Sequence, residues 1–67
     1  MSVTATVNGT PTRVADGATV SDVLTGLGVG EAGIAVALDG AVHPRGRWSE
    51  PVCDGAVIEV LTAVQGG

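Results

Sequence analysis

Large aromatic side chains are almost missing from this sequence. It contains no phenylalanine and no tyrosine, and Trp48 is its only aromatic residue. Ligand pockets are usually concavities lined by apolar and aromatic side chains. A chain of 67 residues also buries only about 60% of the surface that its unfolded form exposes. A deep pocket is therefore not expected, and the composition argues against a self-contained enzyme.

Lysine is absent, and three arginines face seven acidic residues, which gives a net charge of −4. Nucleic-acid binding normally needs a stripe of basic side chains. The sequence therefore predicts no nucleic-acid partner, and its acidic balance favours a basic protein partner.

Cysteine is scarce as well. Cys53 is the only one, which excludes, within one chain, a disulfide framework, a zinc site of several cysteines and an iron–sulfur cluster. We expect no metal and no bound cofactor. Residues 1–9 lack the basic start and apolar run of a signal peptide, and no stretch approaches the roughly 20 apolar residues of a membrane span. We therefore expect a cytoplasmic protein with no membrane partner.

The chain opens with a hairpin pattern. Residues 2–8 alternate between apolar and polar side chains, which indicates a half-buried strand. Asn8-Gly9 is a strong hairpin signal, because both residues tolerate positive φ. A second strand is predicted over residues 10–14, and Pro11 places it at the edge of a sheet.

A short helix follows. Thr19 is typical of an N-cap, and Gly28 is well placed to end the helix. Between them lies one apolar stripe with the spacing i, i+3, i+4, i+7, formed by Val20, Val23, Leu24 and Leu27. So short a helix would not hold alone, and it must pack on the sheet.

The remaining patterns predict three more strands. Residues 34–38 are all apolar and indicate a central strand covered on much of both faces; residues 41–43 indicate a short strand. Residues 56–64 alternate and form the last strand, which we expect beside the first. The fold class is α+β: a β-grasp, or ubiquitin-like, fold with a mixed sheet of four to five strands packed on one main helix. We expect one domain over residues 1–64 and a flexible tail over residues 65–67.

Three segments carry a family resemblance: GATVSDVLTGL, GIAVALDGAVHPRGRW and DGAVIEVLTAVQGG. Together they resemble the ThiS family, the sulfur carriers of thiamine thiazole biosynthesis. The most specific parts are the final Gly66-Gly67 and the segment Pro44-Arg45-Gly46-Arg47-Trp48, at its spacing before Asp54-Gly55. Ala56 departs from the family, whose members often carry a second acid there.

The resemblance implies a chemical role for Gly67. Its α-carboxylate is ionised at neutral pH and is a poor electrophile. By resemblance, a ThiF-like enzyme adenylates it with ATP. Sulfur from a cysteine desulfurase or equivalent then displaces AMP, and the thiocarboxylate serves a ThiG-like thiazole synthase. The chain itself would then catalyse nothing.

The tail suits that role sterically. Gly66 and Gly67 have no Cβ and can thread a narrow channel. Val64 and Gln65 connect them to the domain; three extended residues beyond Val64 project roughly 10 Å. We expect these four residues to enter the active site of a partner.

A docking patch is predicted beside the tail. Ile58 and Val60 should face the helix, so that Leu61 and Glu59 point outward. Ala35 and Ala37 would share that outer face. We expect the patch formed by Leu61, Glu59, Ala35 and Ala37 to dock the adenylating enzyme and the thiazole synthase.

Five other side chains invite a role. His43 is expected to have a structural or surface role, since no nucleophile accompanies it, and Cys53 to pack in the core. Arg45 and Arg47 either pair with acids of a partner or belong to a solvated turn, with one arginine bonding a local carbonyl. Trp48 is expected to cover one end of the core with its indole N–H on backbone, or else to anchor an interface.

Three alternative functions remain open at this point. The same carrier chemistry could serve molybdopterin or cysteine synthesis, because the tail would be the same. The chain could be a ubiquitin-like tag joined to lysines of its targets through Gly67. It could also be a β-grasp binding module with an inert tail.

Overall fold

The computed structural model describes residues 1–30 and 33–62. Within them the order of elements is β1 (Ser2–Val7), β2 (Thr10–Ala15), α1 (Val20–Leu27), β3 (Ile34–Leu38), β4 (Ala41–Val42), the 3₁₀ turn η1 (Arg45–Arg47) and β5 (Val57–Thr62). The predicted continuation of the last strand over residues 63–64 and the tail, residues 65–67, lie outside the described residues.

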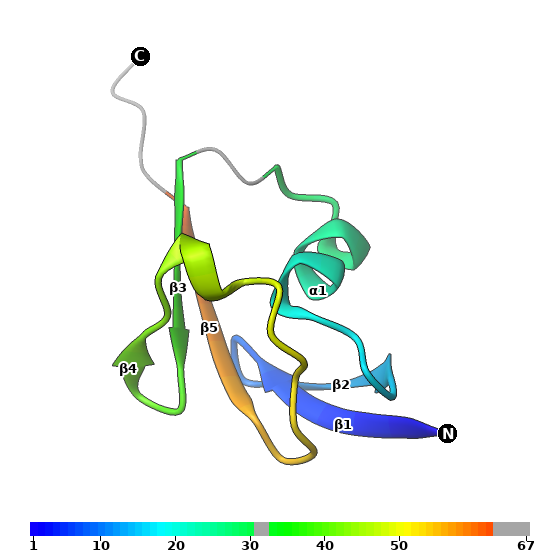
Figure 1. The fold of residues 1–67 in the computed structure, drawn as a ribbon. Coiled ribbons are helices and arrows are strands. Elements are labelled where there is room, and N and C mark those ends of the chain that lie inside the picture. The colour runs from blue at the N-terminus through cyan, green and yellow to red at the C-terminus, as the bar shows by residue number, and fades with distance from the viewer. Residues whose placement is uncertain (31–32, 63–67) are drawn as a thin grey trace.

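The strands form one mixed sheet in the order β2-β1-β5-β3-β4 (Figure 1). β1 and β5 are parallel, whereas the other neighbouring pairs are antiparallel. The last strand therefore returns beside the first, as predicted, and α1 lies on one face of the sheet. This arrangement confirms the β-grasp, and it places Pro11 on the edge strand β2.

Two hairpin turns use the same backbone geometry. Asn8 and Gly9 have φ values of 50° and 82°, and Asp39 and Gly40 have 51° and 86°. Positive φ at both central residues is the conformation that Asn-Gly and Asp-Gly pairs accept most readily in a two-residue hairpin. These turns set the register, in which Val7 faces Thr10 and Leu38 faces Ala41.

Helix α1 has the predicted ends. The Thr19 hydroxyl accepts from the Asp22 N–H at 3.1 Å, and the Asp22 carboxylate accepts from the Thr19 N–H at 3.0 Å. Gly28 ends the helix with φ of 78°. One member of the predicted stripe does not reach the core: Leu27 is 45% exposed, because it is the last helical residue and the chain turns away at Gly28.

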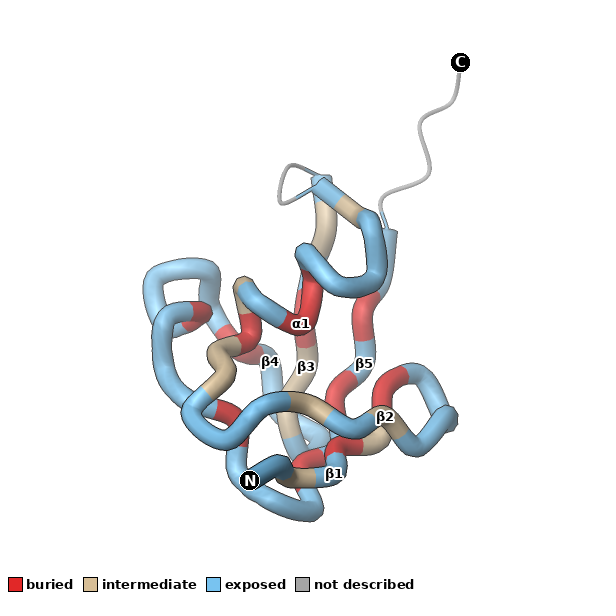
Figure 2. Tube along the Cα trace, turned by 90° about the vertical axis from the view of Figure 1, so that its right-hand side faces the viewer, coloured by how far each residue is buried: buried red, intermediate tan, exposed pale blue. Residues whose placement is uncertain are grey.

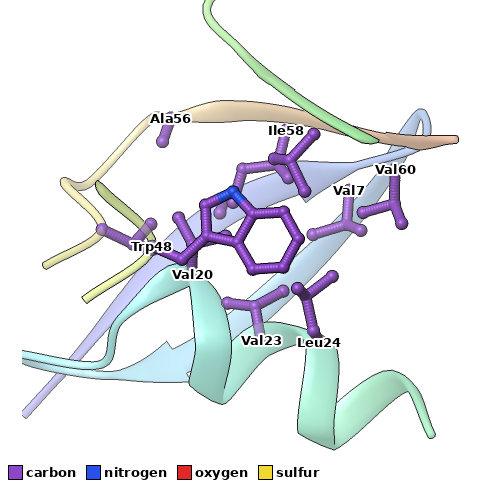
Figure 3. Packing of buried hydrophobic residues seen from close by; sticks show 11 residues of the cluster. Val7, Val20, Val23, Leu24, Trp48, Ala56, Ile58 and Val60 are labelled. Carbon is purple, nitrogen blue, oxygen red and sulfur yellow. The ribbon is translucent and has the colours of Figure 1, made fainter. Parts of the chain in front are cut away.

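The core lies between α1 and the sheet. Leu24, Ile58 and Val20 are the largest fully buried side chains. Buried and exposed residues alternate along β5, with Ile58 and Val60 inward (Figure 2). Figure 3 shows the Trp48 indole among the side chains of the core. The indole is much larger than the valine and alanine side chains around it and fills space that they leave.

Strand β3 differs from its prediction. Val36 is buried, but Ala35 is exposed, so this strand is covered on one face only. The reason is that α1 lies on one side of the sheet, and no second α-helix is present in the described ranges 1–30 and 33–62 to cover the other side.

Candidate functional site: an apolar face beside the end of β5

The predicted patch residues meet on the outer face of the sheet, opposite α1. In the β3–β5 register Ala35 lies directly across from Leu61, and Ala37 from Glu59. Residues that face each other across a strand pair point to the same side of the sheet. Leu61 is 63% exposed, Glu59 and Ala35 are exposed, and Ala37 is half-buried. The structure thus brings the four residues together, with one negative charge among apolar neighbours.

A shallow hollow of about 250 Å³ lies at one end of this face. It is lined mostly by apolar atoms, from Gly33, Ile34, Ala35, Leu61 and Thr62. Sequence reasoning missed Gly33, Ile34 and Thr62. Thr62 enters the hollow because it pairs with Ile34, and this register between distant strands is not encoded in any local motif.

Two valines widen the apolar face at its other end. Val42, opposite Ala37, is 82% exposed, and Val57 is 47% exposed. The alternation of the last strand predicts the outward direction of Val57, whereas Val42 lies in a two-residue strand too short to show a period. Neither valine was part of the predicted patch.

The described part of the chain ends at Thr62, on the rim of the hollow. Val64, Gln65, Gly66 and Gly67, the predicted tail residues, lie outside the described residues. Five residues separate Thr62 from the end of Gly67, and a fully extended chain of that length reaches at most about 18 Å. Any site that receives Gly67 must therefore lie within this distance of the hollow.

His43 and Trp48 are structural, as predicted. His43 is buried, and its Nε2 lies 3.0 Å from the carbonyl oxygen of Arg47. The Trp48 indole N–H donates to the carbonyl oxygen of His43 at 2.9 Å, and the residue is 3% exposed. With this exposure Trp48 is a core residue in the isolated chain and not an interface anchor.

Cys53 is a free thiol and is exposed, so the prediction that it packs in the core is wrong. The neighbouring Val52 is the residue that packs in the core. The Val52 N–H donates to the carbonyl oxygen of Ala18 at 2.7 Å, and the Cys53 carbonyl accepts from Ala56 at 3.1 Å across the Asp54-Gly55 turn. Holding the backbone in this way turns Val52 inward and Cys53 outward.

Both arginines of the 3₁₀ turn interact within the chain. Arg47 Nε donates to the Glu50 carboxylate at 2.9 Å. The hydrogen bond and charge of Arg47 hold the pKa of Glu50 below its usual range, and Glu50 raises the pKa of Arg47. The Arg45 guanidinium lies 5.8 Å from the centre of the Trp48 ring, in cation–π range. Arg47 therefore pairs with an acidic side chain of its own chain.

Within residues 1–30 and 33–62 no three His, Cys, Asp or Glu side chains gather closely enough to hold a metal ion. None of the helices described there is long and apolar enough to cross a membrane.

Comparison with known proteins identifies the family. The model of the ThiS family matches residues 5–67. This chain belongs to the ThiS family. A crystal structure of a thiamine biosynthesis protein (ThiS) from Geobacter metallireducens is 36% identical, covers 97% of this chain and 100% of that one, and superposes with a TM-score of 0.71. A solution structure of a thiamine biosynthesis protein from the same organism gives the same identity and TM-score and covers 97% of this chain and 88% of that one.

No curated protein matches the chain. The family resemblance drawn from the sequence is confirmed, and so is the fold. In this ThiS-family chain the Pro44–Trp48 segment forms a 3₁₀ turn that carries Trp48 into the core.

Proposed function

We propose that this ThiS-family chain is a sulfur carrier in thiamine biosynthesis and that its reactive group is the carboxylate of Gly67. The family match and the two similar structures, both of which are thiamine biosynthesis proteins, support the pathway. The observation that carries the mechanism is the apolar outer face, which adjoins Thr62 five residues before Gly67.

The proposed chemistry has two steps at one carbon. The Gly67 carboxylate attacks the α-phosphorus of ATP on a ThiF-like enzyme, which forms a mixed anhydride with AMP and releases pyrophosphate. Sulfur carried as a persulfide by a cysteine desulfurase or an equivalent donor then attacks the carbonyl carbon, and AMP leaves with the C–O bond electrons. A thiol next attacks the donor's sulfur atom in the resulting acyl disulfide, which breaks the S–S bond, releases the acyl-bound sulfur and leaves a disulfide between donor and thiol. The product is a thiocarboxylate that gives its sulfur to a ThiG-like thiazole synthase.

In this scheme the carrier and its partner enzymes have different tasks. The chain supplies an acyl group and a docking surface, whereas ATP binding and sulfur transfer belong to the partners, so the carrier is not itself an enzyme and binds no cofactor. We place it in the cytoplasm with these partners.

The length of the chain between Thr62 and Gly67 limits where a partner enzyme can dock. An enzyme that holds Gly67 must place its active site within about 18 Å of Thr62, and the hollow and Leu61 lie beside that residue. We propose that the patch formed by Leu61, Glu59, Ala35 and Ala37 packs against an apolar region of each enzyme. Glu59 and the net charge of −4 favour a basic rim around that region.

Activation can be tested directly. The cognate adenylating enzyme is incubated with ATP and either the intact chain or a variant lacking Gly67, and pyrophosphate release is measured. We expect release with the intact chain and none above background with the shortened one, because its last carboxylate no longer reaches the α-phosphorus. Equal release from both proteins would refute the role of Gly67.

Mass spectrometry of the protein from its native cells tests the product. A thiocarboxylate replaces one oxygen by sulfur, which adds about 16 Da at the carboxyl group that is otherwise ionised. Adducts with other proteins would instead indicate a tag, and an unmodified end in cells that are making thiamine would indicate an inert tail.

A further inference from the structure

Asn8 bonds to β5 through its side chain at the point where the neighbouring strand β1 ends. The backbone turns away there, since Asn8 has φ of 50°, and its N–H donates to the carbonyl oxygen of Ile58 at 2.9 Å. Its Oδ1 accepts from the Val60 N–H at 2.8 Å, and its Nδ2 lies 3.4 Å from the Val60 carbonyl oxygen. The carboxamide thus takes the place of a backbone amide and continues the pairing of β5 past the end of β1.

Core packing ends at the same residue. Val60 is the last buried residue of β5, and Leu61 and Thr62 after it are exposed. On the β3 side, Leu61 and Thr62 line the hollow. The end of β5 is therefore held by its pairing with β3 and by the carboxamide of Asn8, without a buried side chain beyond Val60.

We propose that Asn8 is a positioning residue for the activation of Gly67. By fixing Val60 from the β1 side, it sets the direction in which β5 continues toward Gly67 and the direction of Leu61 before any partner binds. The inference rests on the proposed carrier function, because it concerns how the acyl end reaches the adenylating enzyme. If the strand end is released, only a fraction of the molecules presents both groups correctly, and the apparent affinity falls by that fraction.

Two substitutions isolate the carboxamide. Asn8→Gly removes both side-chain bonds to Val60 and keeps the positive φ, which glycine adopts without strain. Asn8→Asp keeps an acceptor for the Val60 N–H and loses the donor to the Val60 carbonyl. We expect Asn8→Gly to impair activation more, and Asn8→Asp to keep most of the wild-type behaviour.

Asp39 offers a matched control. It also has positive φ, precedes a glycine in a hairpin, and bonds to β5 through its side chain, since its Oδ1 accepts from the Val57 N–H at 2.9 Å. That bond lies at the start of β5, five residues before Thr62. Asp39→Gly therefore removes one side-chain bond to a β5 N–H, the counterpart of the Asn8 Oδ1 bond, and leaves two consecutive glycines, as Asn8→Gly does, but it leaves the end of β5 untouched.

The experiment measures KM and kcat of the adenylating enzyme for each carrier by pyrophosphate release, well below every unfolding midpoint. For Asn8→Gly we expect KM to rise about three- to tenfold, the effect of one or two lost hydrogen bonds. We expect kcat to be unchanged, because the enzyme holds the tail once it is bound. Asp39→Gly should keep the wild-type KM, and Asn8→Asp should lie between the two. If Asn8→Gly does not fold, the comparison of Asn8→Asp with Asp39→Gly decides.

Amide hydrogen exchange in the free carrier supplies a second readout. Asn8→Gly should accelerate exchange at Leu61, which faces Ala35 on β3, while amides of α1 keep their rates. A purely structural role would raise KM or exchange equally in Asn8→Gly and Asp39→Gly, and that result, or an unchanged KM in Asn8→Gly, would overturn the inference. A wild-type chain that is never adenylated would refute the proposed function itself, which separates the two failures.

Discussion

At the scale of single residues, the one aromatic side chain is the bulkiest member of the core cluster. Trp48 lies in a cluster otherwise made of small and medium aliphatic residues, and its indole N–H is bonded to His43. His43 is fixed in turn, because its backbone N–H donates to the Val36 carbonyl oxygen at 2.8 Å and its ring Nε2 forms a hydrogen bond with the Arg47 carbonyl oxygen. Trp48 and His43 thus tie the irregular segment before β5 to β3.

Replacing Trp48 by phenylalanine tests this arrangement. Trp48→Phe removes the donor to the buried His43 carbonyl and leaves space where the larger ring was. An unsatisfied buried acceptor costs about 1–3 kcal/mol, so we expect the free energy of unfolding in urea to fall by at least that amount. A loss below about 0.5 kcal/mol, within the range of ordinary surface changes, would contradict a structural role for the indole bond.

Cys53 gives the opposite expectation. Its side chain is exposed and Val52 occupies the core beside it, so Cys53→Ser should change the free energy of unfolding by no more than about 0.5 kcal/mol. Val52→Ala, the buried neighbour, serves as the comparison and should cost clearly more. Similar losses from both substitutions would mean that the thiol is packed after all.

At the scale of elements, local signals predicted almost everything that depends on neighbouring residues. Asn8-Gly9 gave the hairpin, Thr19 and Gly28 gave the ends of α1, and alternation gave the two faces of β5. The errors concern burial against distant parts of the chain. Leu27 and Cys53 are exposed and the outer face of β3 is uncovered, because burial there depends on where another element lies, and local sequence does not carry that information.

The outer face of β3 and β5 supports a prediction about Leu61. Leu61→Asp places a charge on the rim of the hollow, in a side chain that is 63% exposed. We expect the unfolding free energy to stay within about 0.5 kcal/mol of wild type. Thiocarboxylate formation by the adenylating enzyme and sulfur donor should fall at least about tenfold, since a desolvated, unpaired charge at an interface is strongly unfavourable.

Leu27 provides the control for that substitution. It is an exposed leucine on α1, on the face of the sheet away from the patch. Leu27→Asp should form the thiocarboxylate at the wild-type rate. If both variants are slowed equally, or if Leu61→Asp is charged with sulfur normally, the docking patch is wrongly placed.

At the scale of the whole molecule, the two sides of one sheet differ: one holds the core and the other carries the proposed docking patch. The helix side holds the core, with Leu24 and Ile58 fully buried. The other side carries Leu61 and its neighbours. The alternation of apolar and polar residues along β5 could predict the two different sides. It could not predict the hollow, because the hollow exists only where the ends of β3 and β5 meet.

This difference between the two sides predicts that the carrier can lose its tail without losing its fold. The described core cluster draws only on residues 5–60, so a chain ending at Val64 should unfold in urea with a free energy within about 0.5 kcal/mol of the full chain. The same protein should release no pyrophosphate above background with the adenylating enzyme, because it lacks Gln65, Gly66 and Gly67. A change of 1 kcal/mol shifts the midpoint of a domain this size by about 4–8 °C, so thermal unfolding detects a stabilising tail readily. A lower midpoint in the shortened chain would show that residues 65–67 belong to the folded domain, and the division at Val64 would then be wrong.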